Sequence, residues 1–356
     1  MNIRHPILAH IDALGQQIWL DQLTREWLLD GTLRAWQAKG VRGVTTNPAI
    51  FEKAISQSDA YRDELATLRR SNLEPEAALE LLVAADVLSA CQQFRATWEA
   101  NAGRAGYVSI EVSPALAHDR DGTIAAAKRL TARIPEPNVL IKIPATAAGI
   151  DAMATLVAEG IGVNVTLIFS PGQWQAVVDA YRRAAAAAQA LGITPGYSVA
   201  SVFLSRMDSA VDPLLAERAP EHPEWQGMTA VAMAKAIGAT YRSLLATDPL
   251  FAAHPQRVLW ASTSTKNPAY SDLLYVEPLI GPETINTLPL ATLEALLDHG
   301  KADEATLALH VDEAHQHLQR LQTLGIDLEA IGADLQRAGL NAFAQAQARL
   351  LAIVAG

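Results

Sequence analysis

Short apolar runs alternate with helical patterns along most of this chain, and this alternation limits its folds more than any other feature. Several runs are apolar throughout, as expected for parallel strands that helices cover on both sides. Between them we predict a helix over 124–133 after the capping turn Asp121-Gly122-Thr123, and another over 171–191 after Ser170. The predicted strands lie at residues 17–21, 41–46, 107–112, 138–143, 162–169, 198–203, 257–261 and 284–288.

Eight strands alternating with helices favour a single (β/α)₈ TIM barrel over an open doubly wound sheet. The second and third strands are about 60 residues apart, as are the sixth and seventh, and such gaps predict inserted helices. We expect an N-terminal helix near residues 6–14 and a helical tail over 289–356, in which 340–354 has the apolar spacing of a docked helix. No flexible linker or charge block divides the chain, so residues 1–356 are expected to form one domain, with the strands and crossover helices over about 15–290.

Composition excludes several classes of protein. Cys91 is the single cysteine, so no intrachain disulfide forms and a cytoplasmic location is expected. The first 20 residues lack a signal-peptide core, and no run approaches the ~18 apolar residues of a membrane span. The net charge is −10, without a Lys/Arg stripe, so neither nucleic acid nor a membrane is an expected partner.

Lys142 lies between aliphatic residues on a short apolar strand. A lysine is almost never fully buried without a partner, and burial disfavours its charged form. A neutral amine attacks carbonyl carbon and forms a Schiff base. Taken alone, this segment is also compatible with a strand-end lysine that reaches water or pairs with a carboxylate.

Polar residues recur at the same end of successive predicted strands, where barrel enzymes carry out their chemistry. Because side chains alternate along a strand, Asn164 and Thr166 share one face, and Ser109 and Glu111 share another. Alone, Glu111 or Asp21 would be read as a capping or surface carboxylate. Two carboxylates, an amine and amides at one barrel end instead predict an active site.

These residues resemble transaldolase, the pentose-phosphate member of the Schiff-base aldolases. The similarity runs from about residue 18 to 288 and includes GVTTNP at 43–48, VSIEVSP at 108–114, IKIPAT at 141–146 and GVNVTLIF at 162–169. The segment WASTSTKNP at 260–268 is similar to the longer transaldolase subfamily of bacteria. The resemblance implies a cofactor-free enzyme.

The resemblance also implies roles for individual catalytic residues. Lys142 forms the Schiff base, and Asp21 takes the proton from the hydroxyl next to the breaking bond. Glu111 and Thr166 hold a water that moves protons while the imine forms and hydrolyses.

Further residues are implied to bind the substrate. Its phosphate meets Arg206 and Ser262. Where many members carry an arginine shortly after that serine, this chain has Lys266, which supplies a point charge in place of a bidentate fork. Substrate hydroxyls are implied to meet Asn47, Asn164 and Ser201.

The activity expected from the resemblance is transfer of a dihydroxyacetone unit. The donor is a ketose phosphate, sedoheptulose 7-phosphate or fructose 6-phosphate, and the acceptor is an aldose phosphate, glyceraldehyde 3-phosphate or erythrose 4-phosphate. One alternative is a fructose-6-phosphate aldolase-like lyase, whose members typically carry Gln at the position of Glu111 and Tyr at the position of Phe203, a substrate-site residue. Another alternative is a non-catalytic sugar-phosphate-binding barrel.

Metal binding and assembly give weaker signals. His310, His315 and His317 lie in a predicted surface helix, and the last two do not share a helical face, so we expect a solvated face and no metal site. Sugar phosphates are the expected partners. The family includes monomers and dimers, and no heptad seam is present, so a homodimer stays open.

Overall fold

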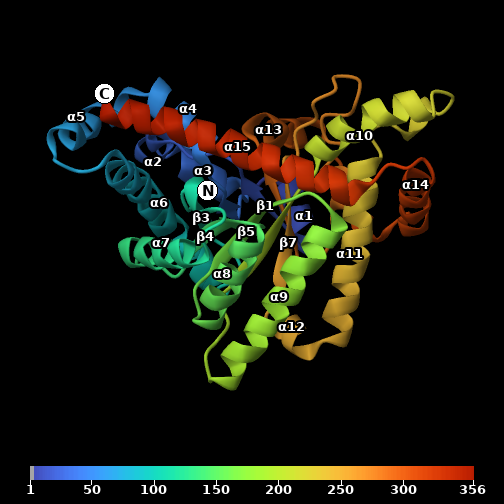
Figure 1. The fold of residues 1–356 in the computed structure, drawn as a ribbon, viewed down its shortest axis with the longest axis horizontal. Helices are drawn as coiled ribbons and strands as arrows, with labels where there is room; N and C mark the ends of the chain where they lie inside the picture. Colours follow the sequence, from blue (N-terminus) through green and yellow to red (C-terminus); the bar gives the residue numbers. More distant parts are fainter. Residues whose placement is uncertain (1–3) are drawn as a thin grey trace.

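The computed structural model describes residues 4–356, in which eight parallel strands close into a barrel in chain order (Figure 1). The first strand pairs with both the second and the eighth, which closes the sheet and confirms the predicted (β/α)₈ architecture. The strands are β1 (Gln16–Leu20), β2 (Gly43–Val44), β3 (Tyr107–Glu111), β4 (Val139–Pro144), β5 (Val163–Ile168), β6 (Ser198–Phe203), β7 (Gln256–Ala261) and β8 (Thr284–Leu288).

Helices surround the barrel, and extra ones fill the two long gaps, as predicted. The gap between β2 and β3 holds α4 (Pro48–Gln57), η1 (Asp59–Tyr61), α5 (Arg62–Arg70) and α6 (Pro75–Ala100), and the gap between β6 and β7 holds α10 (Ser205–Arg218), η3 (Pro223–Trp225), α11 (Thr229–Thr247) and α12 (Pro249–Ala253). The others are α1 (Pro6–Ala13), α2 (Arg25–Asp30), α3 (Thr32–Lys39), η2 (Pro114–Leu116), α7 (Arg120–Arg133), α8 (Ala147–Ala158), α9 (Pro171–Ala190), η4 (Glu277–Leu279), α13 (Leu290–His299), η5 (Thr306–Ala308), α14 (Val311–Thr323) and α15 (Leu328–Ala355).

Two predicted boundaries were wrong. Strand β2 has only two residues in place of 41–46, because the chain turns after it so that Asn47 caps α4, which begins with a proline. Helix α7 begins at Arg120 and not at 124, since the Asp119 side chain accepts a hydrogen bond from Gly122 N and supplies the cap that we placed at residues 121–123. The predicted cap at Ser170 is confirmed.

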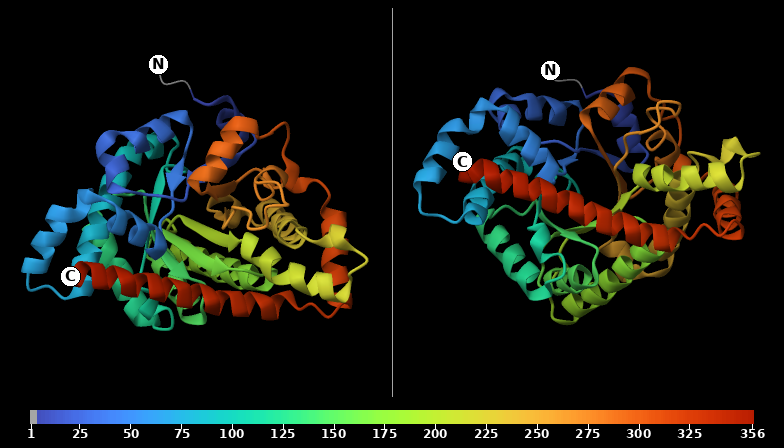
Figure 2. Two further views of the ribbon diagram at one scale, coloured as in Figure 1. Left: turned by 90° about the horizontal axis from the view of Figure 1, so that it is seen from above. Right: turned by 45° about the horizontal axis from the view of Figure 1, so that its top comes forward.

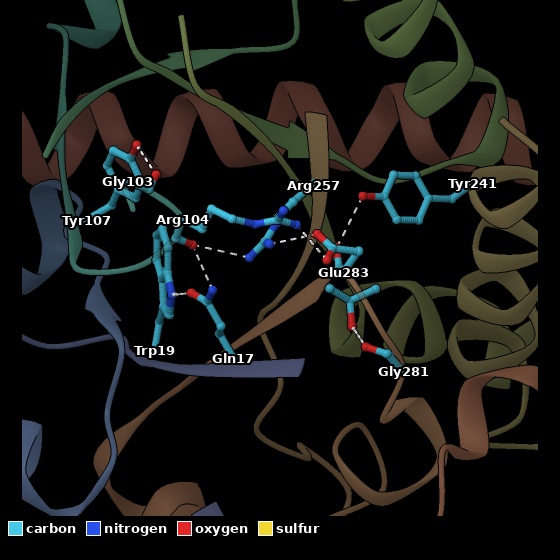
Figure 3. Close-up of polar contacts among 10 residues, drawn as sticks. Gln17, Trp19, Gly103, Arg104, Tyr107, Tyr241, Arg257, Gly281 and Glu283 are labelled. Atoms are coloured by element: carbon cyan, nitrogen blue, oxygen red, sulfur yellow. Dashed lines mark hydrogen bonds and ion pairs between the residues drawn. The ribbon is translucent and has the colours of Figure 1, made fainter. Parts of the chain in front are cut away.

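A polar cluster closes the N-terminal end of the barrel (Figure 3). The buried guanidinium of Arg257 pairs with Glu283 at 2.6 Å and donates to the carbonyl of Arg104 at 3.2 Å. Gln17 donates to the same carbonyl, and Tyr241 donates to the carbonyl of Glu283. Because the buried Arg257 guanidinium is paired with a partly exposed carboxylate and hydrogen-bonded, we interpret the cluster as structural, and reactive groups are expected at the opposite end of the barrel.

Helix α15 crosses the C-terminal end of the barrel (Figures 1 and 2). The Gln336 side chain donates to the carbonyl oxygens of Ala145 and Leu167, at 2.9 and 3.1 Å. Gly339 packs against Leu167 so closely that a Cβ there would lie 2.9 Å from the leucine side chain. The docked helix expected over 340–354 is therefore the second half of a longer helix that covers the barrel mouth.

By length and composition alone, α6 could cross a membrane, with a mean hydropathy of 1.3 over its most apolar window. Half of that window is buried inside the structure, and the helix packs against β3 and α15. The apolar face of α6 is therefore accounted for by the barrel core.

The solvated face predicted for the histidines of α14 was wrong at one position. His317 is fully buried and meets the Thr229 hydroxyl at 3.1 Å, and burial lowers its pKa to about 4. The helix turns this side toward α11, while His315 is exposed. Among residues 4–356, no group of three or more His, Cys, Asp or Glu side chains could hold a metal ion.

Candidate active site

A cavity of about 190 Å³ opens at the C-terminal end of the barrel, and Phe343 of α15 is part of its lining. Most of the site residues predicted from sequence line it; Asn164 is not in its lining, and Glu111 lines a neighbouring cavity of about 120 Å³ that also includes Asn47. The predicted residues at its surface are Asp21, Asn47, Lys142, Thr166, Ser201, Phe203, Arg206, Ser262 and Lys266.

Lys142 points into the barrel from β4 and is 4 % exposed. Its Nζ donates to the carbonyl oxygen of Thr46 at 3.0 Å and lies 3.4 Å from Glu111 Oε2. The ring of Phe343, from α15, has its centroid 5.7 Å from the amine. The amine is therefore buried at the cavity surface, with a carboxylate and an aromatic ring from α15 near it.

Glu111 lies next to Lys142 because β3 and β4 pair in that register. Burial raises the pKa of Glu111 to about 7, although the neighbouring amine opposes the shift. Within residues 4–356, neither Glu111 Oε2 nor Thr166 Oγ1 has a hydrogen-bond partner. Such buried polar atoms cost free energy unless solvent or a ligand satisfies them, so both are available to groups that enter the site.

Asp21 follows directly after β1 on the other side of the amine. Burial raises its pKa, while Lys142 and the Thr45 hydroxyl lower it. That hydroxyl donates to Asp21 Oδ1 at 2.6 Å and also contacts the hydroxyl of Thr287 at 2.7 Å, which fixes the carboxyl group. Two carboxyl groups with raised pKa values beside a buried amine are an arrangement typical of acid–base catalysis.

Two amide side chains hold parts of the site in place. Asn164 donates to Ser109 Oγ at 3.0 Å and accepts from Ser201 Oγ at 2.7 Å, so it lies beneath Ser201 and not at the cavity surface. Asn47 uses its oxygen to cap α4, accepting from Ile50 N at 3.0 Å. Its amide nitrogen is then the atom left for a ligand in the cavity.

The far end of the cavity carries positive charge. Arg206, in the first turn of α10, lies over the Phe203 ring at 5.7 Å and has no carboxylate partner among residues 4–356. Lys266 donates to Ser264 Oγ at 2.8 Å. Burial lowers the pKa of both cations, and Arg206 lowers that of Lys266 further. In an acidic chain, two adjacent cations make a local site for an anion.

Sequence reasoning missed several residues at this site. Thr45 donates to Asp21, Thr287 contacts the Thr45 hydroxyl and Ser264 accepts from Lys266, and all three line the cavity. Thr45 belongs to the motif at 43–48, so its position next to a strand end was a usable signal. Phe343 is distant in sequence, and nothing in its local pattern indicates which surface α15 covers.

Comparisons with known proteins show the family. The model of the transaldolase/fructose-6-phosphate aldolase family matches residues 18–354. The chain belongs to this family. A transaldolase of Neisseria gonorrhoeae is 47 % identical over 97 % of this chain and 99 % of its own length, and one of Thiobacillus denitrificans is also 47 % identical over the same shares. A transaldolase of Acidothermus cellulolyticus is 43 % identical over 98 % of this chain and 95 % of its own.

Proposed function

We propose that this protein is a transaldolase that works through a Schiff base on Lys142. The transferase activity follows from the family and from relatives similar over nearly the whole chain. The observation that carries the assignment of the nucleophile is the burial of the Lys142 amine, 4 % exposed, with Glu111 Oε2 3.4 Å away. The donor is a ketose phosphate, the acceptor an aldose phosphate, and the transferred group a dihydroxyacetone unit.

The first step joins the amine to the ketone carbon of the donor. Lys142 attacks as the neutral amine, and the oxygen leaves as water after protonation. Glu111 can both accept and donate protons near neutrality because its pKa is raised to about 7. A water held between Glu111 Oε2 and Thr166 Oγ1 would satisfy two buried polar atoms and carry these protons.

Asp21 is the base for carbon–carbon cleavage. It takes the proton from the hydroxyl on C4, the C3–C4 electron pair moves into the iminium, and an aldose phosphate leaves. The resulting enamine on Lys142 then attacks the acceptor aldehyde, whose oxygen recovers the proton from Asp21. Hydrolysis of the new imine releases the product and restores the amine.

The cations and hydroxyl-binding groups position the sugar. Arg206 and Lys266 hold the phosphate, with Ser262 beside them, which is binding energy remote from the reacting carbons. Asn47 and Ser201 bind substrate hydroxyls. Asn164 acts through Ser201, which it holds from beneath.

A lyase that releases free dihydroxyacetone is the second candidate, since the matching family also includes fructose-6-phosphate aldolases. Glu111 and Phe203 favour the transferase, because the lyases that this chain resembles typically carry Gln and Tyr there. A Lys142→Ala variant tests the enzyme reading, with fructose 6-phosphate and erythrose 4-phosphate as substrates. We expect transfer to fall to background. Full transfer by this variant would exclude both the Schiff base on Lys142 and the roles assigned around it.

We also infer that residues 1–356 form one domain, since α15 packs on α4, α6 and β5. A cytoplasmic location is supported by the single, buried Cys91. We propose sugar phosphates as partners, without nucleic acid, membrane or cofactor. A homodimer is the assembly to test first, by light scattering.

A further inference from the structure

The two cations of the anion site come from different elements. Arg206 lies at the start of α10, whereas Lys266 lies in the segment that follows β7. Lys266 is exposed and makes one side-chain hydrogen bond within residues 4–356, to a neighbour on its own segment. A lysine has a flexible stem and would lose conformational freedom on binding an anion. Its distance from Arg206 therefore depends on how the 262–270 segment is held against α10.

One end of this segment is joined to the start of α10. Ser205 N donates to the carbonyl oxygen of Ser262 at 3.0 Å, and the two hydroxyl groups lie 2.9 Å apart. Leu204 N donates to the carbonyl oxygen of Ala261 at 3.0 Å. Ser262 has φ +54°, a left-handed conformation that a side-chain-bearing residue rarely adopts, so the segment leaves the strand in a defined direction.

The other end is joined to the same helix further along. Tyr270 donates its hydroxyl to Asp212 Oδ2 at 2.7 Å, and Asp212 Oδ1 accepts from Gly227 N at 2.9 Å. Asp212 lies about 9 Å along the axis from Arg206, at 1.5 Å per residue. Burial and the Asp212 carboxylate raise the pKa of Tyr270 to about 12, so the phenol stays protonated. The Tyr270 N–H closes a turn on the carbonyl of Asn267, the residue after Lys266.

A similar contact to α10 lies five residues beyond the segment, at Tyr275. Tyr275 donates its hydroxyl to Asp208 Oδ2 at 2.8 Å, and Asp208 Oδ1 accepts from Ala230 N. Asp208 and Asp212 are one turn apart on α10 and face the segment together. Helix α10 thus carries Arg206 at its start. Further along one side it carries the two aspartates that bind the segment bearing Lys266 and the tyrosine beyond it.

We propose that Tyr270 and Asp212 are positioning residues that hold Lys266 at the distance from Arg206 at which both cations meet one phosphate group. This rests on the proposed function, since it assigns the phosphate of the substrate to that pair. The two residues act through the loop and do not touch the reacting carbons. Their loss lowers affinity for phosphorylated substrates and leaves the chemical step unchanged.

A Tyr270→Phe variant removes the hydroxyl and keeps the ring that packs against Gly227. We expect KM for fructose 6-phosphate to rise about three- to tenfold, in the range that the net contribution of one typical hydrogen bond supports, while kcat changes less than about twofold. Inorganic phosphate should bind more weakly by a similar factor, measured by calorimetry. With unphosphorylated fructose as donor, kcat/KM should equal that of the unaltered protein.

Tyr181→Phe is the matched control. It removes a tyrosine hydroxyl that donates to the carbonyl of His254 at 2.8 Å, in the contact of α9 with α12 away from the cavity, and should change none of these values. An Asp212→Ala variant should weaken phosphate binding like Tyr270→Phe, and the double variant should be no weaker than the worse single one. Melting temperatures of all variants identify any that fail to fold.

Equal phosphate affinity in Tyr270→Phe and the unaltered protein would overturn the inference. A loss of activity toward fructose as large as the loss toward fructose 6-phosphate would also overturn it. Calorimetry with phosphate needs no turnover. The phosphate measurement therefore tests the inference even if the unaltered protein shows no transfer activity. Absence of transfer would count against the proposed function alone.

Discussion

Glu111 is exposed to water in the unfolded chain and buried in the folded protein. The Glu111→Gln variant measures how this burial makes the stability of the protein depend on pH. The Glu111 side chain is 6 % exposed, and burial raises its pKa from an ordinary 4.5 to about 7. The folded protein therefore holds a proton that the unfolded chain releases between those two values. The contribution of Glu111 to stability is complete below pH 4.5 and is lost as pH rises through 7.

The size of this loss follows from the shift. A difference of about 2.5 pKa units at 1.36 kcal/mol each gives about 3 kcal/mol, as an order of magnitude. Glutamine keeps the shape of the side chain and cannot ionise. The free energy of unfolding of Glu111→Gln minus that of the unaltered protein should therefore be about 3 kcal/mol larger at pH 8 than at pH 4.5, so the variant is relatively more stable at the higher pH.

Urea unfolding at these two pH values, followed by tryptophan fluorescence, measures the difference. Contributions that do not change with pH cancel in the comparison. Glu294→Gln, at an exposed position of α13, is the matched control and should leave the pH dependence unaltered. If Glu111→Gln keeps the pH dependence of the unaltered protein to within about 0.5 kcal/mol, burial of an ionisable Glu111 is refuted. The same variant should lose about 10²-fold or more in transfer rate, since the proton carrier is gone.

Two further predictions concern the same cavity. Phe203→Tyr places a hydroxyl beside the enamine and should raise release of free dihydroxyacetone relative to transfer, by up to about tenfold; an unchanged ratio in a product assay would count against the transferase reading of Phe203. Dialysis against EDTA should leave the transfer rate intact, since no metal-ligand cluster is present among residues 4–356; activity lost to EDTA and restored by a divalent cation would contradict the metal-free mechanism.

The barrel could be predicted because its strands are apolar on both faces and end in polar residues, a pattern that is local in sequence. Lys142, Thr166 and Ser201 reach the cavity because alternation along a strand fixes which side chains face inward. The length of β2 was not predictable in this way. A strand over 41–46 and a two-residue strand followed by a turn, at which Asn47 caps the next helix, both fit the apolar pattern.

Contacts between distant elements escaped prediction. The burial of His317 depends on how α14 rotates against α11, which the largely polar sequence of α14 does not indicate. The contacts of Asn164 with Ser109 and Ser201, on two other strands, were also not indicated by the sequence. Phe343 comes to the amine only because α15 crosses the barrel mouth.

Reductive trapping tests the central claim most directly. Borohydride added to the protein with fructose 6-phosphate should leave a three-carbon adduct on the amine of Lys142, found by mass spectrometry of its peptide, and none in Lys142→Arg. An adduct on another lysine, or none while the protein carries out transfer, would contradict the Schiff base at this position.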